Sequence, residues 1–226
     1  MRGGAAAMAG HHGWHDLYGV ARGTSILYLL GTAAFVPGGL LLFPSLGEGH
    51  EREAIALYIG GSAALTVAAL VDARPVLLRC CPSRTPSGNS RTLDAALCCL
   101  LSAGLCFLTA SIALWPPFKP EGTAIGRWVF RSGNFWYIAA SAASWRAAGG
   151  WRPPLGASLY ALAEIVFFAG GLLLHEVGPH VEEGVACWVA AALLLVAGAS
   201  VGVHGQFCGR AQPAADKGGG APSTGA

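Results

Sequence analysis

The chain has 226 residues, of which 54% are hydrophobic and only 12% are charged, and its formal net charge is +2. Because a soluble globular domain carries about 25% charged residues, this composition excludes an ordinary water-facing surface and indicates a membrane protein. The arginines are spread between apolar runs, so the sequence gives no basis for nucleic-acid binding.

Six runs with few or no charges are long enough to cross about 30 Å of hydrocarbon as α-helices. In chain order they are Thr24–Leu46, Ala54–Val71, Ala95–Trp115, Trp128–Ala148, Leu155–Leu174 and Gly184–Val203. The fourth is the weakest, since Arg131 lies near its start and Arg146 near its end. The sequence therefore predicts an all-α, polytopic membrane bundle of six transmembrane helices.

Three stretches share a pattern in which a phenylalanine is followed, three and four positions later, by two small residues. They are FVPGGLLLFP from Phe35, FLTASIALWP from Phe107 and FFAGGLLLHE from Phe167. Each stretch continues with three apolar residues before it leaves the apolar run. This recurrence indicates that the chain is built from internal repeats.

A second element recurs after each of the first two stretches. Tyr58 precedes the pair Gly61-Ser62, and Phe130 precedes the pair Gly133-Asn134. In the third copy we expect the equivalent pair at Val189-Ala190. The sequence thus predicts three two-helix hairpins with a linker and two tails, at residues 1–23 (tail with a possible interfacial segment), 24–78 (hairpin 1), 79–92 (polar cytoplasmic linker), 93–148 (hairpin 2), 149–205 (hairpin 3) and 206–226 (disordered tail).

The first hairpin carries the most complete version of this pattern. Its residues are Phe35, Gly38, Gly39, Phe43, Pro44, Tyr58, Gly61 and Ser62, and they recur in part as Phe107, Ser111, Trp115, Pro116, Phe130 and Gly133. The repeated unit resembles the two-helix hairpin of the YrhK-like membrane domain family. That resemblance implies a membrane-embedded hairpin with no established reaction.

Small residues are expected to form the contacts between helices. Lipid is as apolar as leucine, so helices in a membrane associate by close packing and not by hiding apolar surface. Glycines let two backbones approach each other. The glycines that we expect at such contacts are Gly38, Gly39, Gly60, Gly61, Gly170, Gly171, Gly198 and Gly202.

The distribution of Lys and Arg predicts the orientation in the membrane. With six spans, ten of these residues lie on the side of the termini, and they are Arg2, Arg22, Arg74, Arg79, Arg84, Arg91, Arg146, Arg152, Arg210 and Lys217. Four lie on the other side, and they are Arg52, Lys119, Arg127 and Arg131. This bias places both termini on the cytoplasmic side of a membrane that the sequence does not identify.

Cysteine and histidine give weaker signals. No cysteine falls in a predicted outer loop, which argues against a disulfide framework. Cys80, Cys81 and Cys208 adjoin predicted spans, where thiols can be lipidated. His50 and His180 share outer loops with several glutamates, which suggests either a patch that binds a hard cation or responds to pH, or a solvated acidic rim.

No enzyme signature is present, and no cofactor or metal motif is found. We therefore expect a protein that is not an enzyme. The first hypothesis is a non-catalytic membrane protein that acts through helix packing or as a subunit of an assembly. Its partners would be the lipid bilayer and other membrane proteins or further copies of the chain. The alternative is a small proton- or cation-coupled transporter or channel that uses Glu164.

Glu164 lies at the middle of the fifth predicted span, Leu155–Leu174. A charged side chain there costs at least about 2.5 kcal/mol. Asn134 is a candidate hydrogen-bond partner, and Arg131 could extend toward the acid. These three residues form the candidate intramembrane polar site, with Glu164 as either a protonated packing residue or a proton or cation relay that faces the bundle interior.

Overall fold

The computed structural model describes residues 22–46, 49–78, 88–119, 121–147, 155–174 and 180–208. Within these ranges the regular secondary structure is entirely helical, so the predicted all-α class is confirmed. The elements are α2 (Arg22–Leu40), α3 (Glu51–Leu77), α4 (Gly88–Ala113), the short 3-10 helix η2 (Pro116–Phe118), α5 (Glu121–Ala147), α6 (Leu155–Leu173) and α7 (Val181–Cys208).

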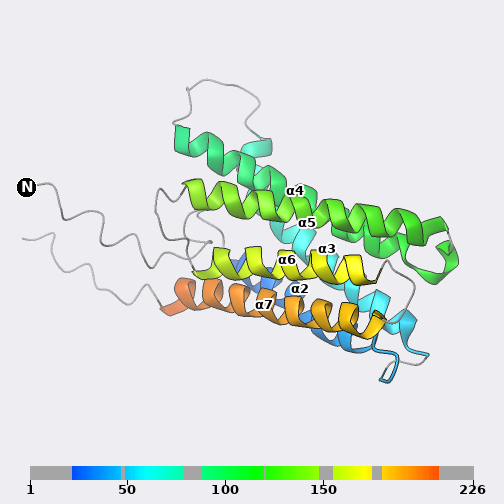
Figure 1. Ribbon diagram of the computed structural model, residues 1–226. Coiled ribbons are helices and arrows are strands. Elements are labelled where there is room, and N and C mark those ends of the chain that lie inside the picture. The colour runs from blue at the N-terminus through cyan, green and yellow to red at the C-terminus, as the bar shows by residue number, and fades with distance from the viewer. Residues whose placement is uncertain are drawn as a thin grey trace, which may run out of the picture.

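The six α-helices run side by side in one bundle (Figure 1). Consecutive helices pair as α2–α3, α4–α5 and α6–α7, and the contacts inside each pair are more extensive than those between pairs. Contacts of α3 with α4, of α5 with α6 and of α7 with α2 join the pairs. The helices therefore form a closed ring around a common interior. Helices α2, α4 and α6 end on the same side of the bundle (right in Figure 1), and we call this side the "loop end". We call the opposite side the "terminal end".

Four of these helices, α3, α4, α6 and α7, are long and apolar enough to cross a membrane. Their outward faces are apolar too, since Leu70, Leu105, Leu162 and Leu193 are each about half exposed. A soluble protein rarely exposes a continuous apolar surface of this kind. The protein is therefore a multi-pass, membrane-associated protein, as the composition predicted.

The first predicted span is shorter in the structure than in the sequence analysis. Helix α2 ends at Leu40 and not at Leu46, so its apolar part is limited to Thr24–Leu40. Pro37 lies inside this helix on its exposed face. Its carbonyl accepts a hydrogen bond of 3.0 Å from the N–H of Leu41, so the proline is accommodated within the last turns of the helix.

The fourth predicted span differs from the prediction in its charge and not in its length. Helix α5 has 27 residues, which is ample length for a bilayer, but it includes Glu121, Arg127, Arg131 and Arg146. Because of these charges, the composition of α5 is not apolar enough to identify it as a membrane-crossing helix. Its charges must therefore find partners or water inside or at the ends of the bundle.

Glycines allow close approach both within a hairpin and across the ring. A Cβ atom at Gly61 would lie 2.7 Å from the carbonyl oxygen of Gly31, and one at Gly39 would lie 2.8 Å from Cγ2 of Val189. The first contact joins α2 to α3, and the second joins α2 to α7 where the ring closes. Four more of the expected packing positions agree: contacts with a neighbouring helix are found at Gly38, Gly170 and Gly198, and Gly202 is buried.

Two of the expected packing glycines do not pack. A Cβ at Gly60 or at Gly171 would have no atom of another helix within 4 Å, so the contact expected at these positions is absent. Gly133 and Gly184, which were not among the expected contacts, do pack closely against Phe107 and Leu174. The side of the helix on which a glycine lies, which hydropathy does not reveal, accounts for the difference.

The adjacent glycines of α3 provide a matched test. We expect Gly61→Ala to destabilise the protein by about 1–3 kcal/mol, because the added methyl group overlaps the Gly31 carbonyl. Gly60→Ala should leave stability unchanged or raise it by up to about 1 kcal/mol, because alanine is the better helix former. Thermal unfolding of both variants in the same detergent measures the difference. Equal melting temperatures for the two variants would contradict the contact.

Candidate functional site

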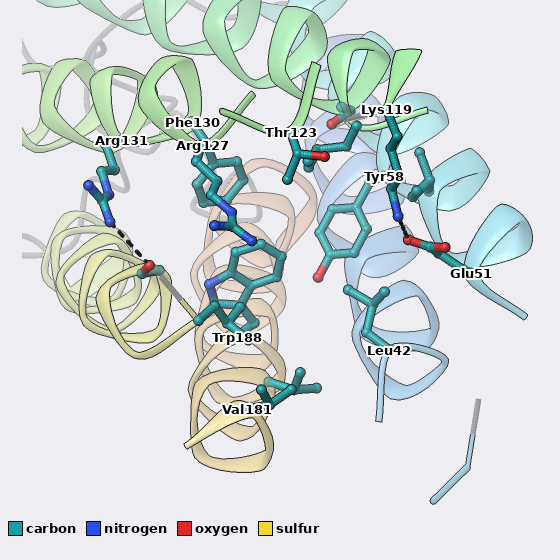
Figure 2. Close-up of a pocket in the computed structure, with 16 residues that line it drawn as sticks. Leu42, Glu51, Tyr58, Lys119, Thr123, Arg127, Phe130, Arg131, Val181 and Trp188 are labelled. Carbon is teal, nitrogen blue, oxygen red and sulfur yellow. Dashed lines mark hydrogen bonds and ion pairs between the residues drawn. The ribbon is translucent and has the colours of Figure 1, made fainter. Parts of the chain in front are cut away.

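A cavity of about 380 Å³ opens at the loop end of the bundle (Figure 2). We call it the end pocket. Its volume lies within the range of about 300–1,000 Å³ that is usual for small-molecule sites. Much of its wall is apolar, and the aliphatic residues in it are Leu42, Ile55, Leu114, Leu174, Val181 and Val185.

The end pocket also contains three cationic side chains and one carboxylate. Lys119 makes an ion pair with that carboxylate, Glu51. Arg131 donates a hydrogen bond of 3.5 Å to the carbonyl oxygen of Gly171, and its guanidinium lies 5.3 Å from the ring centre of Trp128. Lys119 is therefore paired with a carboxylate and Arg131 is hydrogen-bonded to a carbonyl, whereas the third cation has neither kind of contact within the described residues.

That third cation is Arg127, which projects into the end pocket beside Trp188 (Figure 2). Within the described part of the chain, Arg127 forms neither a hydrogen bond nor an ion pair. The indole Nε1 of Trp188 and the hydroxyl of Tyr58 are buried and likewise have no hydrogen-bond partner among the described residues. The pocket therefore presents several unused hydrogen-bond donors, whereas its one carboxylate is already paired.

Aromatic rings form the floor of the end pocket. Each α-helix contributes one ring to it, and in chain order these rings are Phe35, Tyr58, Phe107, Phe130, Phe167 and Trp188. The centres of neighbouring rings lie between 5.0 Å (Phe130–Trp188) and 6.4 Å (Phe35–Phe167) apart. We call these six rings the aromatic layer. Contacts of this geometry are favourable for aromatic pairs, so the layer closes the interior below the pocket.

Glu164 lies on the other side of the aromatic layer. Its side chain is 0% exposed and borders a small central cavity of about 10 Å³. Tyr58 and Phe130 line both this cavity and the end pocket, so rings of the aromatic layer lie between the two spaces. Neither carboxyl oxygen of Glu164 has a hydrogen-bond partner within the described residues. The acid thus faces the bundle interior.

The expected pairing around Glu164 is not formed. Asn134 is also 0% exposed, but both atoms of its amide lack a hydrogen-bond partner in the described part of the chain, so the predicted bond to Glu164 is absent. Arg131 does not extend toward the acid, because it is directed to Gly171 and the end pocket. Sequence depth alone had grouped three residues, of which Glu164 borders the central cavity, Arg131 lines the end pocket and Asn134 is among the lining residues of neither.

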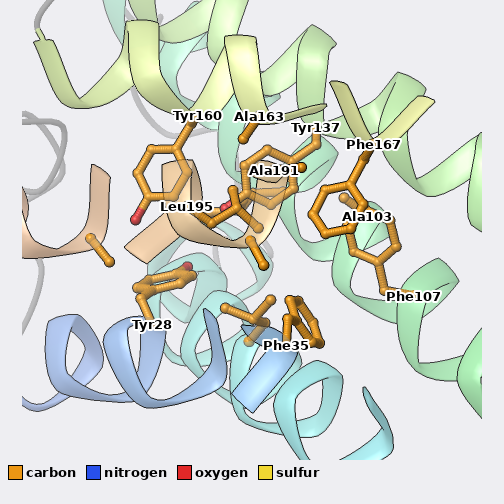
Figure 3. Packing of buried hydrophobic residues seen from close by; sticks show 14 of the residues in the cluster. Tyr28, Phe35, Ala103, Phe107, Tyr137, Tyr160, Ala163, Phe167, Ala191 and Leu195 are labelled. Atoms are coloured by element: carbon orange, nitrogen blue, oxygen red, sulfur yellow. The ribbon is translucent and has the colours of Figure 1, made fainter. Parts of the chain in front are cut away.

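Further polar side chains lie between Glu164 and the terminal end. Tyr28, Tyr137 and Tyr160 project into this region of the interior (Figure 3), and the rings of Tyr137 and Tyr160 are 5.8 Å apart. Asp72 of α3, which directly follows the predicted span Ala54–Val71, lies in hydrogen-bonding reach of Thr24 and Tyr28. The interior on this side of the aromatic layer therefore contains several polar groups.

Each described histidine at the loop end lies near a glutamate of the helix that follows it. His50 lies 3.9 Å from Glu53, and His180 lies 3.8 Å from Glu183. Within the described residues no group of three or more His, Cys, Asp or Glu side chains could hold a metal ion. The described residues therefore give no support to a cation-binding patch shared by the outer loops. Three further residues of these loops, Glu48, His175 and Glu176, lie outside the described residues.

The three candidate lipidation sites adjoin the ends of α3 and α7 in the sequence. Cys80 and Cys81 lie outside the described residues, and the side chain of Cys208, at the end of α7, is not described. Four cysteines within the helices are free thiols, and they are Cys98, Cys99, Cys106 and Cys187.

Two residues of the site were missed by sequence reasoning. Arg127 was counted only as a loop charge, and Trp188 was not recognised as an equivalent of Tyr58 and Phe130. The repeat pattern contains a signal for Arg127, which lies three residues before Phe130. Ile55 and Val185 lie three residues before Tyr58 and Trp188, so the three residues occupy equivalent positions in the hairpins. Trp188 was overlooked because the connection before α7 is shorter than the one before α3, which shifts the spacing of the aromatic residue.

Comparisons with known proteins supply no assignment. No protein-family model, no curated protein and no solved structure matches the chain.

The lack of a partner for Glu164 predicts an unusual effect on stability. Glu164→Met should raise the free energy of unfolding by about 1–3 kcal/mol, because it removes a buried polar group without breaking a hydrogen bond. Ser62→Ala should lower it, since the Ser62 hydroxyl lies 3.3 Å from that of Ser111 and the two share a hydrogen bond. Thermal unfolding in detergent compares the two. A loss of stability in Glu164→Met would mean that the carboxyl is a structural group.

Proposed function

We propose that all six helices cross the bilayer as three related hairpins. The pairing of consecutive helices and the one ring that each helix contributes to the aromatic layer support this arrangement. Trp188 then takes the position of Tyr58 and Phe130, which aligns Ala191-Ala192, and not Val189-Ala190, with the Gly-Ser pair of the first hairpin. The resemblance to the YrhK-like membrane domain family rests on the same hairpin pattern and belongs to this proposal.

We further propose that the protein moves protons across the membrane, with Glu164 as the proton-binding group. The observation that carries this proposal is a fully buried carboxyl that borders the central cavity and has no hydrogen-bond partner within the described residues. An unsatisfied buried polar group costs about 1–3 kcal/mol. A bundle that served only to pack helices would gain by replacing this glutamate. Carboxyl groups inside membrane proteins commonly serve as proton relays.

The size of the central cavity favours a proton over a larger cation. A volume of about 10 Å³ is close to the least that holds one water molecule. A hard cation needs six or more oxygen ligands, whereas a proton needs only a carboxyl, a hydroxyl or a water. Tyr137 borders the same cavity, and Tyr28 and Asp72 continue the polar groups toward the terminal end.

The competing hypothesis is a non-catalytic membrane protein that acts by helix packing or as a subunit of an assembly. The tight glycine contacts and the aromatic layer favour it, because they pack the described helices closely against one another. Under this hypothesis Glu164 has no role in transport. The two hypotheses therefore differ in what happens when Glu164 can no longer titrate.

Proton flux in proteoliposomes distinguishes the hypotheses. The purified protein is reconstituted with a trapped pH-sensitive dye, and a potassium diffusion potential made with valinomycin drives proton entry. We expect wild-type protein to acidify the lumen faster than protein-free liposomes do. Glu164→Gln should reduce the protein-dependent rate to background, because glutamine keeps the shape of the side chain but does not exchange a proton.

The matched control is Glu182→Gln, the same substitution at an exposed position in the first turn of α7. It should leave the flux at the wild-type level. Circular dichroism and the melting temperature show whether each variant is folded. Equal flux in wild type and Glu164→Gln, or wild-type flux no faster than in protein-free liposomes, would reject the proton pathway and favour the packing hypothesis.

The orientation is a separate part of the proposal. The ten cationic residues on the side of the termini, against four on the other side, favour a terminal end in the cytoplasm. We expect reporter tags inserted after Glu48 and after Arg84 to lie on opposite faces of the membrane, with the second tag in the cytoplasm. Protease protection or cysteine labelling in intact cells measures this. Tags on the same face would exclude six spans.

A further inference from the structure

We propose that the end pocket binds an organic anion with an apolar body, such as a medium-chain carboxylate, whose anionic group is held by Arg127. This site is separate from the proton pathway proposed above, and neither proposal depends on the other. The ligand class follows from the charges, the hydrogen-bonding groups and the wall of the pocket.

The charges of the pocket favour an anion. Three cations line it, and its single carboxylate, Glu51, is taken up by Lys119. Arg131 uses its guanidinium on the Gly171 carbonyl. Arg127 keeps all its donors free, and a guanidinium matches the two oxygens of a carboxylate or phosphate with parallel hydrogen bonds.

The uncharged polar groups agree with this choice. The indole N–H of Trp188 is a donor only, and the hydroxyl of Tyr58 can donate; both are buried without a partner in the described part of the chain. The hydroxyl of Ser111 already donates to the carbonyl of Phe107 at 2.8 Å. An anionic ligand would satisfy donors that the protein leaves unused, whereas a cation would find no free carboxylate.

The position of Arg127 shows that its charge is not required by the fold. Ile55 and Val185 occupy the corresponding positions on α3 and α7, three residues before the aromatic residue, and they are 6% and 2% exposed. An apolar side chain is thus what the other two hairpins place there. Arg127 lines the end pocket without a partner among the described residues, so a bound anion would satisfy donors that the protein itself leaves unused.

The remaining wall defines the other part of the ligand. Aliphatic side chains and the rings of Phe130 and Trp188 surround the cavity, so a purely polar anion would leave most of this surface without contact. A cavity of about 380 Å³ accommodates a small molecule. Two sources supply this chemistry: a free carboxylate that enters from water, or an anionic phospholipid that enters from the bilayer.

Equilibrium binding of radiolabelled octanoate tests the proposal. The full-length protein is placed in nanodiscs of phosphatidylcholine, which has no net charge, and binding to empty nanodiscs is subtracted. We expect saturable binding at one site per chain. Unlabelled octanoate should compete, whereas octanol, which is neutral, and octylammonium, which is a cation of the same length, should not compete.

The variant that tests the assigned residue is Arg127→Gln. It should weaken octanoate binding about 10- to 100-fold, as expected for the loss of a charge-assisted hydrogen-bonded pair. Arg146→Gln is the matched control, because Arg146 lies on the same helix at the terminal end and is exposed. It should bind octanoate as wild type does. If Arg127→Gln does not fold, the charge selectivity of the wild-type protein still decides the outcome.

A second arm separates the two sources of the anion. The melting temperature is measured in nanodiscs of phosphatidylcholine with and without phosphatidylglycerol. Stabilisation by phosphatidylglycerol that is lost in Arg127→Gln, without octanoate binding, would identify the ligand as a lipid headgroup. The proposal is overturned if neither probe binds saturably, if Arg127→Gln binds as wild type does, or if octanol or octylammonium competes as well as octanoate.

Discussion

Close approach of the helix backbones is the constraint on which the rest of this structure depends. Lipid provides no hydrophobic force between apolar helices, so packing must hold them together. Gly31 and Gly61 face each other across the first hairpin, and Gly170 and Gly184 do so across the third. In the second hairpin, Gly133 lies against the ring of Phe107. Because the helices meet so closely, a ring from every helix reaches the common interior and the aromatic layer can form.

The features that could be predicted from the sequence are those set by local pattern. Hydropathy located the helices, and the repeat pattern included five of the six rings of the aromatic layer, namely Phe35, Tyr58, Phe107, Phe130 and Phe167, although the pattern predicted no such layer. The depth of Glu164 placed it at the middle of its helix. The direction of a side chain around the helix axis depends on how neighbouring hairpins fit together, and no local pattern records this. For that reason Arg127 was not recognised as a pocket residue, and similar depth wrongly suggested a bond between Glu164 and Asn134.

The polar groups of the interior fall into two kinds. The hydroxyls of Thr32, Thr66 and Ser144 donate to backbone carbonyls one turn earlier in their own helices, so they are satisfied without help from another helix. Glu164 and Asn134 are equally buried but have no hydrogen-bond partner within the described residues. Hydroxyl groups of the first kind are ordinary in membrane helices. Groups of the second kind reduce stability, and they mark the interior positions where a role other than packing is most plausible.

The ring architecture suggests where the two cavities could be brought into contact. Contacts are more extensive inside the hairpins than between them, and the contact between α5 and α6 is the least extensive of those that close the ring. Glu164 belongs to α6 and Asn134 to α5, and near the loop end these two helices are joined by the hydrogen bond from Arg131 to Gly171. The aromatic layer lies between Glu164 and the end pocket, and Phe130 of α5 and Phe167 of α6, whose ring centres are 5.9 Å apart, are its members at this seam. A proton that passed from the end pocket to Glu164 would therefore have to cross this layer.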